Sequence, residues 1–96
     1  MAKLTVTSPD PRPLKPLLEA ALQNERRILE AGIRRTTERL QTFEARHGTS
    51  SAEFLQRYES NALPETLDFV EWVGECRLLA RLREKIDTLE KIHIAN

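Results

Sequence analysis

Residues 43–59 read FEARHGTSSAEFLQRYE and contain the turn around which the rest of the chain is organised. Gly48 can adopt the left-handed conformation that ends many helices. Ser50 and Glu53 have the spacing of a capping box, which begins a helix. We therefore predict that one helix ends near His47 and that a short helix follows over residues 51–59.

A long amphipathic helix is predicted before this turn, over residues 16–47. Pro16 suits the first turn of a helix, where its missing N–H costs nothing. Apolar side chains then recur at the spacing of a coiled-coil seam. They are Leu18, Leu22, Leu29, Ile33, Leu40 and Phe43.

A second long helix is predicted over residues 66–92. Thr66 can cap its N-terminus, and Asp68 places negative charge at the positive end of the helix dipole. The first half has a broad apolar face around Trp72, which indicates contacts on two sides. The second half narrows to a stripe formed by Leu79, Leu82, Ile86, Leu89 and either Ile92 or His93.

These elements predict an all-α fold, with two long antiparallel helices joined through the short one in a single domain over residues 16–96. The aromatic side chains all lie near the connection, so we expect them to anchor the core: Phe43, Phe54, Tyr58, Phe69 and Trp72. A helix of about 27 residues is roughly 40 Å long, so the short helix covers only one end. We therefore expect two copies to form a four-helix bundle.

Residues 1–15 are expected to form an extended N-terminal arm. In residues 3–7 apolar and polar side chains alternate, which is weakly typical of a strand, and the prolines at 9, 11 and 13 prevent a helix. The arm is either a frayed tail or a strand added to a partner or to a symmetry mate. On the second interpretation Leu4 and Val6 join the stripe Leu79, Leu82, Ile86 and Leu89 as the candidate interface.

Charge argues against a nucleic-acid partner, because the formal net charge is zero. Residues 1–48 carry nine Lys/Arg and six Asp/Glu, whereas residues 49–96 carry six and nine. Opposite charge on the two halves favours pairing of the helices with each other. No apolar run approaches the ~20 residues of a membrane span, and the first residues do not resemble a signal peptide. The expected location is the cytoplasm.

No pattern in the sequence predicts catalysis, a cofactor or a metal. Cys76 lies on the apolar face and is expected to be a buried thiol. Glu44 and His47 have a spacing found in di-metal bundles, but the further inward carboxylates of such a site are missing. Glu71 and Glu75 are expected to pair with arginine. Two arginine pairs, at 26–27 and 34–35, are expected to be solvated or salt-bridged.

Residues 43–73, with the matching motifs at 43–54 and 69–72, resemble a group of small prokaryotic helical proteins. The shared pattern is an aromatic residue, a basic residue and a glycine turn, then Ser-x-x-Glu-Phe and a later aromatic before Glu-Trp. His47 stands where the group usually has tyrosine, and residues 61–64 lack its usual glycine. Members are often encoded beside a candidate toxin, so the resemblance implies an antitoxin that binds and covers a toxin.

The expected function is therefore protein–protein interaction, as an antitoxin-like homodimer. The alternative is a self-associating coiled-coil-like structural or adaptor protein without a toxin partner. A helical enzyme or metal-binding bundle is a third hypothesis. A repressor of its own promoter is a fourth, against which the neutral charge and the missing DNA-reading motif count.

Overall fold

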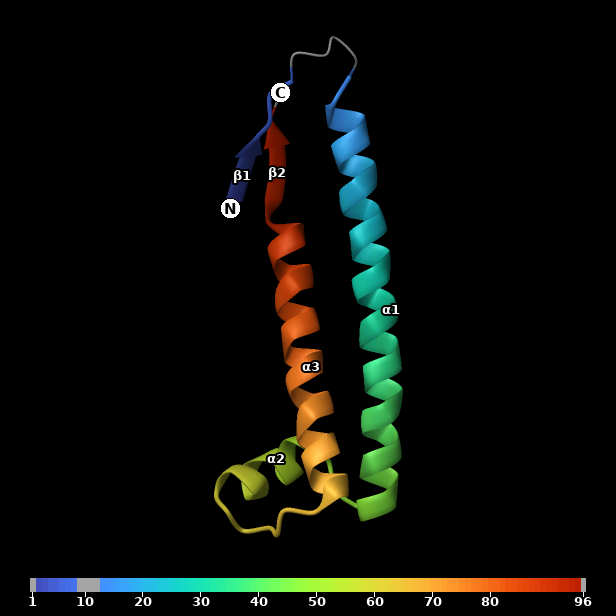
Figure 1. The fold of residues 1–96 in the computed structure, drawn as a ribbon, viewed down its shortest axis with the longest axis vertical. Coiled ribbons are helices and arrows are strands. Elements are labelled where there is room, and N and C mark those ends of the chain that lie inside the picture. Colours follow the sequence, from blue (N-terminus) through green and yellow to red (C-terminus); the bar gives the residue numbers. More distant parts are fainter. Residues whose placement is uncertain (1, 9–12, 96) are drawn as a thin grey trace.

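The computed structural model describes residues 2–8 and 13–95. Its elements follow the order β1 (Ala2–Thr5), α1 (Lys15–His47), α2 (Ser51–Glu59), α3 (Leu67–Glu90) and β2 (Ile92–Ala95). Helices α1 and α3 run side by side in opposite directions, and α2 packs near the end where they are joined (Figure 1). The mostly helical hairpin predicted from the sequence is therefore confirmed.

The helix boundaries follow the predicted caps. Gly48 ends α1 with a left-handed φ of 66°. The Ser50 hydroxyl accepts a hydrogen bond from the Glu53 N–H at 3.1 Å. The Glu53 carboxylate does not complete the capping box, because it accepts a hydrogen bond from the Thr49 hydroxyl instead. Thr66 caps α3 by accepting a hydrogen bond from the Phe69 N–H at 3.1 Å.

The last helix is shorter than predicted. It ends at Glu90, and residues 92–95 form a strand in place of a further helical turn. Strand β2 pairs in parallel with β1, with Leu4 opposite Ile94. This small sheet corrects the all-α expectation. The sequence of β2 fits a strand, because Ile92 and Ile94 lie on one face, where Ile94 is buried, and the exposed His93 lies on the other.

The N-terminal segment is not a frayed tail, because residues 2–5 form strand β1. It lies against β2 of its own chain, on the side away from α1 (Figure 1). Most of the proline-rich part of the predicted arm, residues 9–12, lies outside the described residues. This pairing could not be read from the sequence, because β1 and β2 are 90 residues apart. They meet because the antiparallel α1 and α3 carry both segments to the open end of the hairpin.

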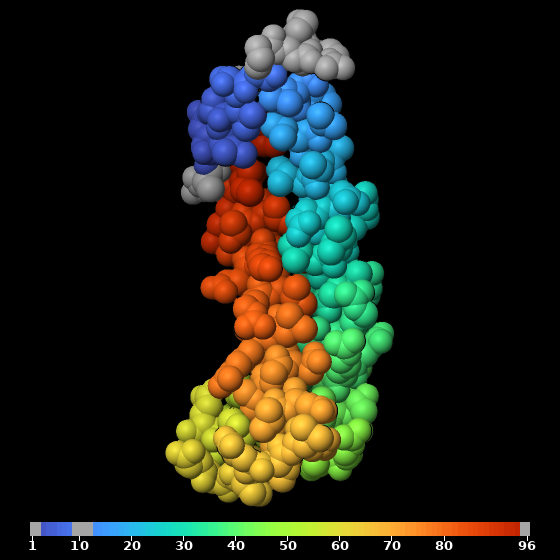
Figure 2. All heavy atoms as spheres, in the orientation of Figure 1, coloured from blue at the N-terminus to red at the C-terminus, as the bar shows by residue number. Residues whose placement is uncertain are grey.

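The core is concentrated at the closed end of the hairpin. Phe54 and Trp72 stack with ring centroids 3.8 Å apart, and Phe43 stacks on Trp72 at 5.6 Å. Leu40 and Val73 complete the buried cluster, while Tyr58 and Phe69 pack against it. Above this cluster α1 and α3 pack against each other, and β2 contacts α1 at the open end, which produces a rod of 60 × 22 × 18 Å (Figure 2).

A close approach of the two long helices marks the middle of the rod. Gly32 is buried in α1, and a Cβ at this position would lie 3.3 Å from Leu82 Cδ1 of α3. The helix-weakening glycine is therefore explained by packing. The half-buried Leu82 occupies the space that a larger side chain at position 32 would need.

Candidate functional site

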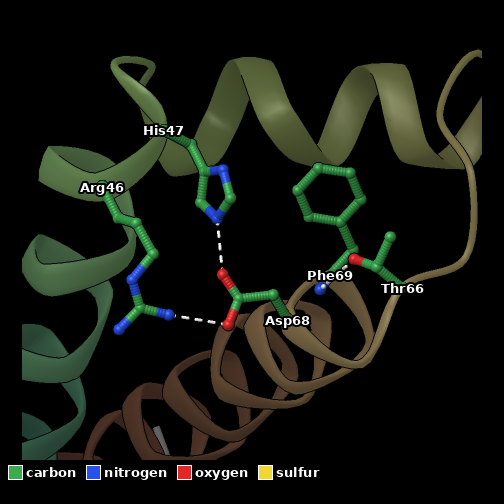
Figure 3. A network of polar contacts seen from close by, with 5 residues as sticks. All are labelled: Arg46, His47, Thr66, Asp68 and Phe69. Atoms are coloured by element: carbon green, nitrogen blue, oxygen red, sulfur yellow. Dashed lines mark hydrogen bonds and ion pairs between the residues drawn. The ribbon is translucent and has the colours of Figure 1, made fainter.

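An ion-pair network closes the hairpin where α1 ends and α3 begins. The carboxylate of Asp68 lies 2.6 Å from Arg46 Nη1 and 2.6 Å from His47 Nε2 (Figure 3). Basic residues in the last turn of α1 and an acidic residue in the first turn of α3 also complement both helix dipoles. Hydrogen bonds from His47 and then Arg46 lower the pKa of Asp68 below its usual value of 3.8. This network positions the two helices.

Further polar contacts near this network each join two segments of the chain. Trp72 Nε1 donates a hydrogen bond to Ser51 Oγ at 2.9 Å. Glu44 accepts a hydrogen bond from the Ser51 backbone N–H at 2.7 Å, so this carboxylate satisfies the start of α2. The Tyr58 hydroxyl donates to Glu65 at 3.1 Å, which raises the pKa of Tyr58.

The Cys76 thiol lies half-buried against the aromatic core. Burial raises its pKa above the usual 9.0, and a thiol is a weak nucleophile when it is protonated. Within residues 2–8 and 13–95, no three His, Cys, Asp or Glu side chains gather in a group that could hold a metal ion. His47 and Glu44 are instead engaged by Asp68 and Ser51.

Charge pairing along the hairpin has a consistent direction. Three arginines of α1 pair with three acids of α3: Arg26 with Glu90 at 2.6 Å, Arg39 with Glu75 at 3.4 Å, and Arg46 with Asp68 at 2.6 Å. The predicted arginine partner of Glu75 is therefore Arg39 of the same chain. This pair is the longest of the three, and Glu75 Oε2 is buried without a hydrogen-bond partner.

A groove lies over this incomplete pair, between α1 and α3. We call it the Gly74 groove, and its lining consists of Arg39, Thr42, Phe43, Glu71, Gly74 and Glu75. Gly74 is exposed, and a Cβ there would have no neighbour within 4 Å. No contact within the chain therefore requires a glycine at this position.

The same side of the hairpin carries exposed apolar side chains. Leu17, Ile28 and Arg39 are spaced by 11 residues, so they lie on one face of α1. Leu17 and Ile28 are 67% and 55% exposed. Leu67, seven residues before Gly74 on α3, is 76% exposed. An upper groove lined by Glu25, Leu29, Glu84, Lys85, Thr88 and Leu89 continues along this side.

The predicted interface residues occupy mixed environments. Leu4 is 45% exposed in β1 and Val6 is half-buried. Leu79, Leu82, Ile86 and Leu89 are half-buried, with Leu79 packed on the core and Leu82 against Gly32. Their contact with another molecule stays a prediction. The 11-residue spacing of Leu17 and Ile28 was the sequence signal for the exposed face, but it is weaker than the seam of α1.

Comparison of the chain with family models, with curated proteins and with solved structures finds no match. Among the described residues, no helix combines the length and apolar character needed to cross a membrane. The functional conclusion therefore rests on the surface of the hairpin itself.

Proposed function

We propose that this chain is a protein–protein interaction module that works as a dimer of helical hairpins. The observation that supports this proposal is the amount of exposed surface. The chain exposes 7133 Å², whereas a compact folded monomer of this mass exposes about 5,700 Å². The difference is larger than the roughly 800 Å² that each partner contributes to a typical specific interface.

The shape of the molecule supports the same conclusion. Its radius of gyration is 19.0 Å, against about 12.5 Å for a compact domain of this length. The molecule is elongated because α1 and α3 form a two-helix rod beyond the core. In this rod one side of each helix faces the other helix and the remaining side is exposed. A four-helix bundle covers more of the exposed side of both helices.

We further propose that the biological partner is a toxin, as the resemblance of residues 43–54 and 69–72 implies. In this form the chain is an antitoxin, and its long exposed face covers the active surface of the toxin. The alternative is a self-associating structural or adaptor protein. The exposed apolar side chains and the incompletely paired Glu75 support self-association under both hypotheses. The two hypotheses therefore differ only in whether the chain also binds a toxin.

Co-expression with the product of the neighbouring gene tests the antitoxin hypothesis. The expected result is that this product arrests growth alone and that the chain relieves the arrest. Tagged chain should also retain the product through purification. Growth arrest that persists despite equal expression of the folded chain would contradict the antitoxin hypothesis and leave the structural alternative.

A further inference from the structure

We propose that the Gly74 groove of one copy receives α1 of a second copy, and that a two-fold axis along the hairpin relates the two. This inference rests on the proposed self-association and specifies its surface. Each α1 then lies over α3 of the other copy, so that four neighbouring helices alternate in direction. Antiparallel neighbours have favourable dipole interactions and form the usual geometry of such bundles.

The first observation is the unsatisfied carboxylate in the groove. Glu75 Oε2 is buried without a partner, and Arg39 reaches the other oxygen only at 3.4 Å. Buried acceptors are nearly always hydrogen-bonded, and leaving one unpaired is costly. A two-fold axis along the hairpin keeps residues at the same height. Arg39 of the second copy therefore arrives at the level of Glu75, with Arg35 one helical turn away.

The second observation is charge complementarity between the helices. Helix α1 carries seven Lys/Arg and five Asp/Glu, whereas α3 carries four and six. A two-fold axis along the hairpin places the positive helix over the negative one. A two-fold axis across the hairpin would place α1 on α1 and repeat the like charges. The charges therefore select the first arrangement and a second copy as occupant.

The third observation is the contrast between two helical glycines. Glycine costs about 1 kcal/mol relative to alanine inside a helix. Gly32 is explained by Leu82 of the same chain, which lies within 3.3 Å of a Cβ built there. Gly74 has no such neighbour within its own chain. Close approach of a second copy supplies the missing reason, because a helix can pack tightly over a position without a side chain.

The fourth observation is the apolar surface on the same side. Ile28 and Leu17 of α1 are exposed on the face that carries Arg39. Docking of α1 over α3 brings this face against the upper groove, where Leu29 and Leu89 are part of the lining. The upper half of the interface then adds apolar contacts from Ile28 and Leu17 to the charged contacts around Glu75 in the lower half.

The central experiment measures the mass of the full chain by light scattering and its dimer dissociation constant by analytical ultracentrifugation. The parent chain has a mass of 11.1 kDa, and a dimer of twice that mass is expected. Gly74→Trp fills the groove and is expected to weaken the dimer at least tenfold. Its circular dichroism should remain helical, because a Cβ at position 74 meets no atom within 4 Å and the side chain can extend into the groove. Gln41→Trp, on the exposed side of α1 away from α3, is the matched control and should remain dimeric.

A charge reversal tests the contact with Glu75. Arg35→Glu places a carboxylate near Glu75 of the second copy and is expected to weaken the dimer about tenfold. Arg34→Glu makes the same charge change on the outer face of α1 and should have little effect. In a Glu75→Gln background the penalty of Arg35→Glu should be smaller, because the repelling charge is gone.

The outcomes separate this inference from the proposed function. A chain that remains monomeric at high concentration would overturn both the groove and the self-association. A parent dimer that Gly74→Trp and Arg35→Glu leave as tight as the two controls would overturn the groove alone. Selective loss of the dimer in both groove variants supports it.

Discussion

Trp72 Nε1 donates a hydrogen bond to Ser51 Oγ, and this contact joins α3 to the first turn of α2. Trp72 is fully buried and stacks on Phe54 of α2. The two residues are 21 positions apart, so the bond forms only after the loop between the helices has folded. It therefore reports directly on the docking of α2.

Ser51→Ala is expected to reduce the free energy of unfolding by about 1–3 kcal/mol, because the buried indole N–H loses its acceptor. Urea denaturation measures this change. Ser60→Ala is the matched control, since the Ser60 hydroxyl donates only to the exposed Arg57 carbonyl. Its effect should be smaller. An equal decrease in the free energy of unfolding in the two variants would show that the hydrogen bond to Trp72 stabilises the fold no more than an exposed one.

Gly48→Ala is expected to cost about 1 kcal/mol, because Gly48 has a φ of 66° and an alanine is strained there. Gly48→Asn should cost less, since asparagine tolerates the left-handed conformation. Thermal unfolding of the two variants compares them. A Cβ at this position meets nothing within 4 Å, so a clash cannot account for the difference. An alanine variant as stable as the parent would contradict this explanation.

The network at Asp68 predicts a dependence of stability on pH. The pKa of Asp68 is lower in the folded chain than its usual value of 3.8. The ionised carboxylate therefore contributes stability above pH 3.8, and this contribution disappears as the pH falls below 3.8 through the folded pKa. Asp68→Asn should lower the melting temperature at pH 6. It should also make the melting temperature fall less steeply as the pH decreases below 3.8. An equally steep fall in this variant would argue against the contribution.

Cys76 is expected to react slowly with iodoacetamide at pH 8, because burial raises the pKa of the thiol above 9.0 and limits access to it. The rate should be well below that of a free cysteine and should rise to that value in urea. Mass spectrometry follows the modification. Rapid alkylation of the native chain would indicate that the aromatic cluster opens frequently.

Gly32→Leu is expected to destabilise the hairpin by about 1–3 kcal/mol, because the larger side chain must displace Leu82. The comparison variant is Ala31→Leu, at the neighbouring half-buried position, which should be tolerated better. Urea denaturation measures both. Similar stability of the two would show that α1 and α3 do not depend on close approach at this point.

The helices and most of their ends could be predicted because their signals are local. The left-handed Gly48, the Ser50 cap and the Thr66 cap each act on backbone groups within a few residues. The end of α3 was misjudged because Ile92 continues the apolar stripe of the helix. Nothing in the local pattern shows that β1 is available to pair with this segment.

The candidate groove was the least predictable part of the molecule. Glu75 was expected to have an arginine partner, but its unsatisfied oxygen depends on the position of α1 relative to α3. Gly74 has no distinguishing sequence pattern, and only the arrangement of its neighbours shows that the space beside it is empty.

Local sequence signals were sufficient to place the three helices and the turn at Gly48, since caps and apolar periodicity act over one or two turns of backbone. The pairing of Leu4 with Ile94 and the contact of Asp68 with Arg46 and His47 follow only from the way the elements pack. Those contacts join residues distant in the chain, and their formation depends on the height and rotation at which two long helices pack.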